Sequence, residues 1–321
     1  MKYTELGHTG IRVSQLCVGC MSFGEVQSEG HQWLLDQAGT EAVVAQAFDL
    51  GINFFDTANT YAGGTSEIYL GNALRSLGIP REDVIIADKV YFNPGHLSKE
   101  AILREADQSL ERLGTDYIDL YQIHRFDYGT PIEETLEALD SLVKAGKVRA
   151  IGASAMFGYQ FHNMMITAEK HGWTQFSTMQ NHHNLIYRED ERELIPVCDQ
   201  YGVSRIPYSP LAGGHLARPD WNSDSLRSRT DVTLRAKYDL AMENDLEIIA
   251  RVHDIAENLS VSMSAVALAW LYTKGVAAPI IGSTKAHHLT DAVKALDIVF
   301  TDAELKYLEE PYRAHEIVGA R

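Results

Sequence analysis

The feature that most constrains the fold of this chain is a repeated alternation of short apolar runs with longer amphipathic runs. Many of the amphipathic runs end at a glycine, which closes a helix in the left-handed conformation without steric cost. Strands that alternate with helices in this way are typical of βαβ units and a parallel sheet. The sequence therefore predicts an α/β fold built by repetition of one unit.

Counting the units predicts a closed barrel. The expected strands span residues 16–19, 53–56, 84–89, 118–124, 148–154, 176–180, 204–208 and 279–282. The expected helices span residues 41–50, 66–77, 99–113, 132–145, 161–171, 193–201, 239–258, 262–274 and 287–296. Eight units favour a (β/α)8 TIM barrel over a doubly wound sheet, and no GxGxxG motif follows the first strand. Residues 3–14 predict an N-terminal β-hairpin, an extra helix precedes strand eight, and residues 1–321 are expected to form one domain.

The composition of the chain indicates which kinds of binding partner to expect. The 321 residues carry 44 acidic and 28 basic side chains, a net charge of −16, which argues against nucleic acid and anionic membrane surfaces. The N-terminal segment has no apolar leader, and the most apolar predicted helix is too short to span a bilayer. Three cysteines do not suggest disulfides, so a reducing, cytoplasmic location is expected. We expect a small-molecule partner, and the pattern predicts no particular oligomeric state.

Cys17 and Cys20 have the spacing of a redox or zinc pair. No second pair accompanies them, and no helix start fits a thioredoxin-like motif. The sequence favours packing roles for both thiols, and no metal is expected.

Reactive side chains follow the predicted strands where a barrel places its active site. Asp56 ends strand two, Tyr61 lies just beyond it, Lys89 ends strand three and His124 ends strand four. Each residue alone has an ordinary structural explanation. Together they are expected to converge, because a barrel brings the ends of adjacent strands to one volume.

This set suits proton donation to an oxygen that becomes an alkoxide. A free tyrosine has a pKa of about 10, which is too high for an efficient acid near neutrality. An ammonium about 4 Å away, at an effective dielectric of about 20, favours the phenolate by roughly 4 kcal/mol. Lys89 is therefore expected to lower the pKa of Tyr61 toward neutral pH. Asp56 would hold the ammonium, and His124 would donate to the carbonyl oxygen.

The segments around these residues resemble the aldo-keto reductase family. The matching blocks, which include NFFDTANTY at residues 53–61 and DYIDLYQIH at 116–124, run in family order. Others lie at residues 71–74, 87–89, 146–152, 208–214 and 281–285. Together with residues 179–188, they resemble the bacterial aryl-alcohol-dehydrogenase-like and potassium-channel-β-subunit-like branch.

The resemblance implies NADPH bound across the barrel mouth and hydride transfer to an aldehyde or ketone, or the reverse alcohol oxidation. It implies that Tyr208 stacks on the nicotinamide and that Ser154 and Gln180 bond its carboxamide. The other implied cofactor contacts are Gly19, Cys20, Met21, Ser209, Leu211, Gly213 and Leu216, with Gly282, Ser283, Lys285, His288 and Asp291 around the adenosine ribose and its 2′-phosphate.

Three positions depart from the family pattern. Ala155 and Ala292 stand where Asn is common, and His288 stands where Arg or Gln is common. Lys285 can supply a charge for the 2′-phosphate, although a point charge discriminates less than a guanidinium fork. NADPH is therefore the expected cofactor, with NADH as the alternative.

Aromatic residues in the loops after the strands suggest a pocket for aromatic or aliphatic carbonyl compounds, and packing of the loops is the alternative. Arg125 could bind an anionic group or pair with Asp127. The pocket candidates are Phe23, Tyr91, Phe92, Arg125, Phe126, Tyr128, Met156, Phe157 and Trp221.

Two other functions stay open at this stage. One is a barrel lyase or isomerase that uses Lys89 as a Schiff-base amine, which a nearby carboxylate would oppose by keeping Lys89 protonated. The other is a nicotinamide-binding regulatory subunit, which would not need all four catalytic residues.

Overall fold

The computed structural model describes residues 1–26, 32–223 and 236–317, and its centre is one sheet of eight parallel strands. The strands follow one another around the sheet in the order β10-β3-β4-β5-β6-β7-β8-β9. Their bounds are β3 Cys17–Gly19, β4 Phe54–Asp56, β5 Ile85–Val90, β6 Ile118–Ile123, β7 Val148–Ser154, β8 Thr178–Gln180, β9 Ser204–Arg205 and β10 Ile280–Gly282.

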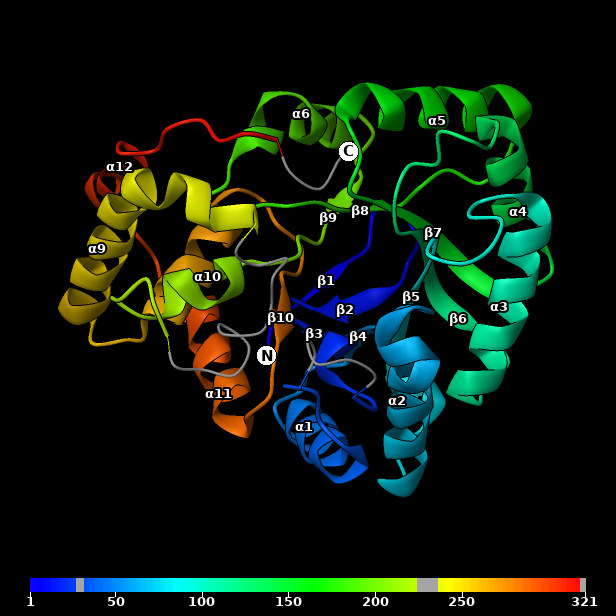
Figure 1. The fold of residues 1–321 in the computed structure, drawn as a ribbon, viewed down its shortest axis with the longest axis horizontal. Helices are drawn as coiled ribbons and strands as arrows, with labels where there is room; N and C mark the ends of the chain where they lie inside the picture. Colours follow the sequence, from blue (N-terminus) through cyan, green and yellow to red (C-terminus); the bar gives the residue numbers. More distant parts are fainter. Residues whose placement is uncertain (27–31, 224–235, 318–321) are drawn as a thin grey trace.

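The sheet closes into a ring because hydrogen bonds join the segments at β9 and β10, the two ends of the strand order. β10 pairs with β3 in parallel. On the other side, the amide of Ala277 donates to the carbonyl of Arg205 and that of Ile280 donates to Pro207, each at 2.9 Å. The predicted (β/α)8 barrel is confirmed, with the helices outside the ring (Figure 1).

The helices pack around the sheet much as the sequence predicts. Gly114 and Gly172 end their helices at positive φ of 67°, as the glycine pattern indicates. The helices are α1 Gln37–Asp49, α2 Thr65–Ser76, α3 Lys99–Leu113, α4 Ile132–Lys144, α5 Gly158–His171, α6 Leu194–Gln200, α9 Met242–Leu259, α10 Met263–Thr273, α11 Ala286–Lys294 and α12 Asp302–Glu309. The short 3-10 turns used below are η3 Tyr61–Gly64 and η6 Ala212–Ala217.

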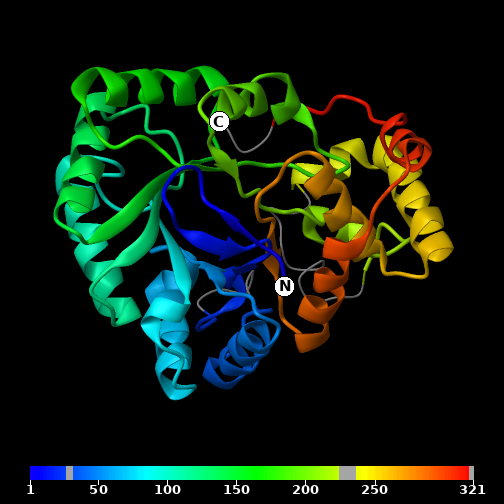
Figure 2. The same ribbon diagram turned by 180° about the vertical axis from the view of Figure 1, so that it is seen from behind.

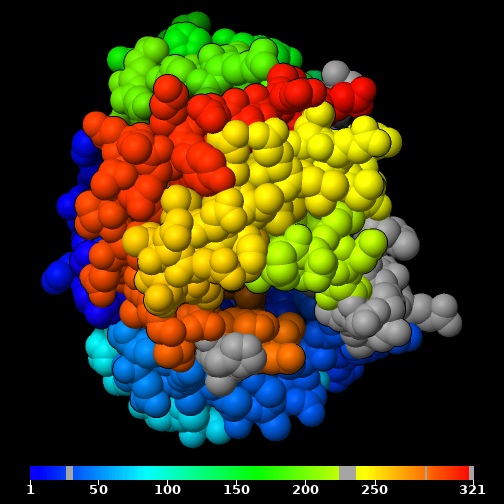
Figure 3. Space-filling model, turned by 90° about the vertical axis from the view of Figure 1, so that its left-hand side faces the viewer, coloured from blue at the N-terminus to red at the C-terminus, as the bar shows by residue number. Residues whose placement is uncertain are grey.

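Helix α12 was not among the expected elements. Thr301 and Glu304 form a capping box at its start, a signal that the sequence does contain. The helix packs against α9, and Figure 3 shows both beside α10 and α11 on one flank of the molecule. This flank also carries the extra helix expected before the last strand.

A hairpin covers the N-terminal end of the ring. β1 Tyr3–Glu5 pairs with β2 Arg12–Ser14 in antiparallel register, as expected. Leu6, Ile11 and Val13 are buried with the residues that point into the barrel. Figure 2 shows the hairpin lying across this end. The hairpin leaves the carboxyl ends of the strands as the end at which chemistry is expected.

Cys17 and Cys20 are both free and fully buried, which agrees with packing roles. In the described residues, no single helix is long and apolar enough to cross a membrane. The helices α9 and α10 reach that length and composition only as a pair bent by 101°, and most of α10 is buried.

Candidate active site

A buried ion pair joins the ends of two adjacent strands. Lys89 on β5 places its Nζ 2.5 Å from Oδ1 of Asp56 on β4, and it also donates to the carbonyl of Thr57 at 2.7 Å. Lys89 is fully buried and Asp56 is 2% exposed. Burial lowers the pKa of Lys89, but Asp56 and Tyr61 together raise it by more than burial lowers it. The pKa of Lys89 therefore lies above its ordinary value. The amine is therefore held as an ammonium, which opposes a Schiff-base role.

Two amides complete the surroundings of the Asp56 carboxylate. Nε2 of Gln122 on β6 donates to Oδ2 at 3.1 Å, and Nε2 of Gln180 on β8 donates to the same oxygen at 2.8 Å. A buried charge is tolerated when it is paired and its lone pairs are bonded. Sequence reasoning did not identify Gln122. Its position two residues after Leu120 and two before His124, on the inward side of the strand, is the signal that could have found it.

Tyr61 opens the η3 turn and lies beside the ion pair. The Lys89 Nζ is 4.8 Å from the centre of the Tyr61 ring. Backbone at positive φ follows at once, at Ala62 (47°) and Gly63 (63°), and turns the chain sharply toward α2. The expected convergence of Asp56, Lys89 and Tyr61 is thus present in the structure.

The pKa of Tyr61 differs from the expectation. Burial raises it above its ordinary value, and the lowering effect of the Lys89 charge is smaller than the effect of burial. Asp56 raises the pKa further, because its negative charge offsets the ammonium. The prediction of a phenol titrating near neutral pH is wrong for this structure, since desolvation was left out of that argument. Tyr61 is a protonated phenol at neutral pH.

His124 packs against Tyr61 at the end of β6. The two rings meet edge to face with centres 5.8 Å apart, and the Phe92 ring lies 5.0 Å from the imidazole. Burial, followed by the charges of Lys89, Arg125 and Lys237, holds the pKa of His124 well below its ordinary value. Its Nδ1 is buried without a hydrogen-bond partner in the described residues. A neutral imidazole of this kind can share one hydrogen bond with a substrate oxygen.

The residues expected at the nicotinamide are engaged with their neighbours. Oγ of Ser154 donates to the Gln180 carbonyl at 2.9 Å, while the Gln180 side chain bonds Asp56. The Tyr208 ring stacks on His182 with centres 5.0 Å apart and planes 13° apart, and Lys237 Nζ lies 4.9 Å from the Tyr208 ring centre. The cofactor roles of Ser154, Gln180 and Tyr208 stay predictions.

The segment after β9 is a tight coil. Ser209 and Ala212 have positive φ of 52° and 49°, and η6 includes Gly213 and Gly214 at positive φ. Arg218, which sequence reasoning missed, donates to the carbonyls of Gly214 and Trp221, and its Nε is buried without a partner in the described residues. An arginine in the loop after a late barrel strand is the signal that could have found it. Figure 3 shows a hollow between η6 and the β10–α11 segment.

The residues expected around the adenosine differ in how far they are exposed. Gly282, Lys285 and His288 are exposed. Ser283 is buried and donates to the Lys285 carbonyl at 2.9 Å, and Asp291 pairs with Lys294 at 2.9 Å. Near the first strand, Met21 is 37% exposed, whereas Gly19, Cys20 and also Leu216 of η6 are buried.

The candidate pocket residues differ in how far they are exposed. Phe92 and Tyr128 are 50% and 66% exposed. Phe23 and Met156 are buried in the core that packs around the sheet, so the structure gives them packing positions. The others are partly or mostly buried: Tyr91, Arg125, Phe126, Phe157 and Trp221. Leu211, which was expected among the cofactor contacts, is also partly buried.

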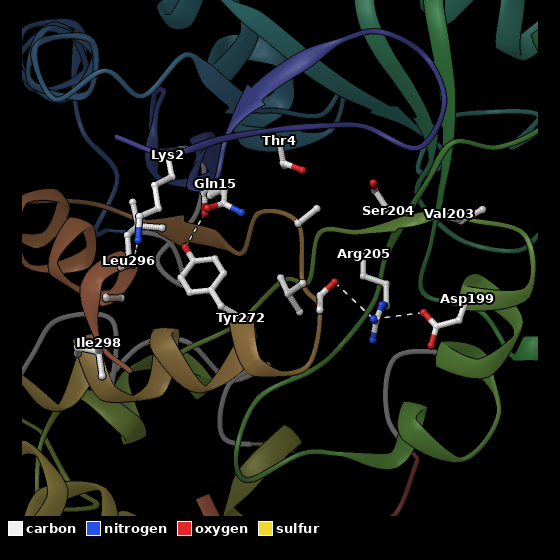
Figure 4. Close-up of a pocket in the computed structure, with 14 residues that line it drawn as sticks. Lys2, Thr4, Gln15, Asp199, Val203, Ser204, Arg205, Tyr272, Leu296 and Ile298 are labelled. Atoms are coloured by element: carbon white, nitrogen blue, oxygen red, sulfur yellow. Dashed lines mark hydrogen bonds and ion pairs between the residues drawn. The ribbon is translucent and has the colours of Figure 1, made fainter. Parts of the chain in front are cut away.

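A cavity of about 530 Å³ lies away from all of these residues (Figure 4). Its lining includes Gln15, Ser204 and Ala277, which stand at the N-terminal ends of their strands, and Arg205, which pairs with Asp199 at 3.2 Å. None of the four expected catalytic residues lines it. The cavity is therefore not the site of the chemistry expected at the carboxyl ends.

Comparison with known proteins identifies the family. The profile of the aldo/keto reductase family matches residues 15–313, nearly the whole chain. The chain belongs to the aldo/keto reductase family. Its relatives are reductases and dehydrogenases, so this aldo/keto reductase is an oxidoreductase.

The individual relatives cover almost the full chain. An aldo-keto reductase of Fusarium vanettenii is 42% identical over 99% of this chain and 92% of its own length. A candidate aryl-alcohol dehydrogenase of Schizosaccharomyces pombe is 41% identical over 99% of this chain and 97% of its length. Versiconal hemiacetal acetate reductase of Aspergillus parasiticus is 40% identical over 97% of both chains. The resemblance to aryl-alcohol dehydrogenases is confirmed.

Proposed function

We propose that this protein reduces aldehydes or ketones with NADPH, or oxidises the corresponding alcohols, with Tyr61 as the group that donates or accepts the proton. The observation that carries the proposal is the buried Asp56–Lys89 pair beside Tyr61 and His124 at the carboxyl ends of adjacent strands. The dehydrogenases and reductases among the relatives support chemistry at carbonyl and alcohol groups.

The described residues fit a phosphorylated dinucleotide. The coil at η6 turns through positive φ, and the buried Arg218 Nε beside it has no acceptor among the described residues, as expected for a group that meets a pyrophosphate oxygen. Lys285 is exposed at the start of α11 and can meet a 2′-phosphate, which favours NADPH over NADH. Tyr208 offers a ring on which a nicotinamide can stack. When bound, the nicotinamide supplies or accepts the hydride.

His124 and Tyr61 have different roles at the carbonyl oxygen of the substrate. Neutral His124 shares a hydrogen bond with the carbonyl oxygen and orients it, and Tyr61 gives its proton to that oxygen as the alkoxide develops. The phenolate left behind lies beside the Lys89 ammonium, whose attraction at about 4 Å and a dielectric of about 20 is roughly 4 kcal/mol. Asp56 holds the ammonium in place. In alcohol oxidation the same proton moves the other way.

The test is to follow NADPH absorbance with 4-nitrobenzaldehyde and a panel of other carbonyl compounds. Turnover that requires both NADPH and the aldehyde supports the proposal. Tight NADPH binding without turnover on any carbonyl would favour a regulatory subunit instead. A borohydride-trapped adduct on Lys89, formed without cofactor, would favour a lyase. We also propose a cytoplasmic location, which suits the free cysteines.

A further inference from the structure

Arg125 has a buried donor with no acceptor. The residue directly follows His124, and its Nη1 is buried without a hydrogen-bond partner in the described ranges. No hydrogen bond or ion pair joins the Arg125 side chain to any other described residue. Leaving such a donor unpaired costs free energy, and proteins rarely do so without a reason. The position therefore indicates a ligand group that accepts from the guanidinium.

The acidic neighbour that could have paired with Arg125 is engaged elsewhere. Oδ1 of Asp127 accepts from the Gly129 amide at 2.8 Å. Its Oδ2 accepts from the Leu97 amide at 3.1 Å and from Oγ1 of Thr130 at 2.7 Å. These bonds fix Asp127 to its own loop and to the start of α3. Of the two alternatives that the sequence left open for Arg125, the internal ion pair is absent.

Three cations act on His124, the residue directly before Arg125. Lys237 places its Nζ 4.9 Å from the Tyr208 ring centre. Lys89, Arg125 and Lys237 each lower the pKa of His124, and no carboxylate is among the groups that shift it. Lys89 is paired with Asp56, whereas the positive field of Arg125 meets no acidic partner among the described residues. This field favours an anion beside the reacting carbonyl.

We propose that Arg125 binds an anionic group of the substrate, so that aldehydes and ketones carrying a carboxylate are preferred over neutral ones of the same shape. The inference rests on the proposed function and names its substrate class. A guanidinium presents a planar fork that matches a carboxylate with two parallel hydrogen bonds.

The test compares two aldehydes that differ in one charge, 4-carboxybenzaldehyde and methyl 4-formylbenzoate. For the wild type we expect a higher kcat/KM with the carboxylate. Arg125→Gln should lower the carboxylate-to-ester ratio of kcat/KM by about tenfold or more, mainly through KM, and Arg125→Lys should recover part of it. The control is Arg12→Gln, which removes the same charge from the exposed hairpin at the other end of the barrel and should leave the ratio unchanged.

Other outcomes would overturn the inference. An equal loss with both aldehydes would make Arg125 a structural residue, and a weaker Kd for NADPH without a change in the ratio would assign it to a cofactor phosphate. If the wild type reduces neither these two aldehydes nor any other carbonyl compound of the panel, the proposed function fails independently of the anion site. Calorimetric binding of benzoate then decides separately, because Arg125→Gln must still weaken it by about tenfold for the anion site to stand.

Discussion

The ammonium of Lys89 lies over the ring of Tyr61, with Nζ 4.8 Å from the ring centre, and the same Nζ lies 2.5 Å from Oδ1 of Asp56. The contact places a permanent cation beside the group that loses a proton. Because burial keeps the phenol protonated near neutral pH, the cation acts on the phenolate that forms during the reaction. Its contribution is thus greatest after the proton has left Tyr61.

Tyr61→Phe should abolish most carbonyl reduction while leaving NADPH binding nearly intact. The change removes only the hydroxyl, whose role lies in the transition state, so we expect kcat to fall by about 10²–10⁴-fold. Steady-state kinetics and fluorescence titration of NADPH measure the two quantities. Tyr3→Phe, which removes a hydroxyl from the hairpin at the other end of the barrel, is the control. A variant that keeps most of its kcat would show that another group is the acid.

The two directions of the reaction should respond differently to pH. Reduction needs protonated Tyr61, whose pKa is raised, so reductive kcat should stay level from neutral pH to about pH 9. Oxidation of a benzylic alcohol needs the phenolate, so its rate should rise with pH over the same range. His124, whose pKa is well below 6.5, should add no inflection near neutrality. The measurement is kcat against pH in both directions.

Lys89→Met should move the oxidative pH profile upward and lower the rate. The substitution removes the charge that lowers the pKa of Tyr61, so a higher pH is needed to form the phenolate. The same pH series on the variant tests this. An unmoved profile would mean that the ammonium does not act on the phenol.

Asp56→Asn should destabilise the fold because it leaves the Lys89 ammonium buried without its counter-ion. Removing one partner of a buried ion pair typically costs about 3–5 kcal/mol. Urea unfolding of the variant measures the loss. The double variant Asp56→Asn with Lys89→Met should recover part of it, since no unpaired charge remains. Equal stability of the single and double variants would show that the pair's charge is not the cause.

Ala155→Asn should stabilise the protein slightly. Ala155 has a positive φ of 45°, a conformation that Asn tolerates better than Ala, so a gain of up to about 1 kcal/mol is expected. The observed φ gives a physical reason for the asparagine that the family often has here. Ala155→Val should have the opposite effect, and thermal unfolding would order the three as Asn, Ala and Val. A reversed order would contradict backbone strain at this site.

Gly71→Ala should loosen the contact between α2 and α3. A Cβ at this position would lie 2.1 Å from the Leu113 carbonyl oxygen and 2.8 Å from its carbonyl carbon, so the backbones must separate. Overpacking of this kind costs about 1–3 kcal/mol, measured as a lower Tm. Ser76→Ala, on the exposed end of the same helix, is the control. A Tm equal to that of the control would show that the two helices can shift without cost.

The barrel and the meeting of its catalytic residues could be predicted because both follow from local patterns. An apolar run marks the strand of each βα unit, and a glycine marks the end of many of the helices. Eight such units predict a barrel, and a barrel brings Asp56, Lys89 and His124 together at the carboxyl ends of its strands. Strand boundaries were less predictable: β9 is two residues long, whereas five were expected, partly because Pro207 has no N–H to continue the ladder.

Properties that depend on the closed ring could not be predicted in the same way. The bonds from Gln122 and Gln180 to Asp56 require three different strands to turn their side chains into one layer. The direction of the Tyr61 pKa depends on how much water the folded site excludes. The spacing of residues in the sequence predicts neither which side chains share a layer inside the barrel nor how much water the folded site excludes.

The bond from Gln180 to Asp56 joins opposite halves of the protein. Asp56, Tyr61, Lys89 and His124 all come from the first four units, yet one donor to the central carboxylate is supplied by β8. A fragment ending after α5 would hold every proton-transfer group and still lack that donor. Chains split between α5 and β8 would therefore regain a fully bonded carboxylate only through complementation of the two fragments.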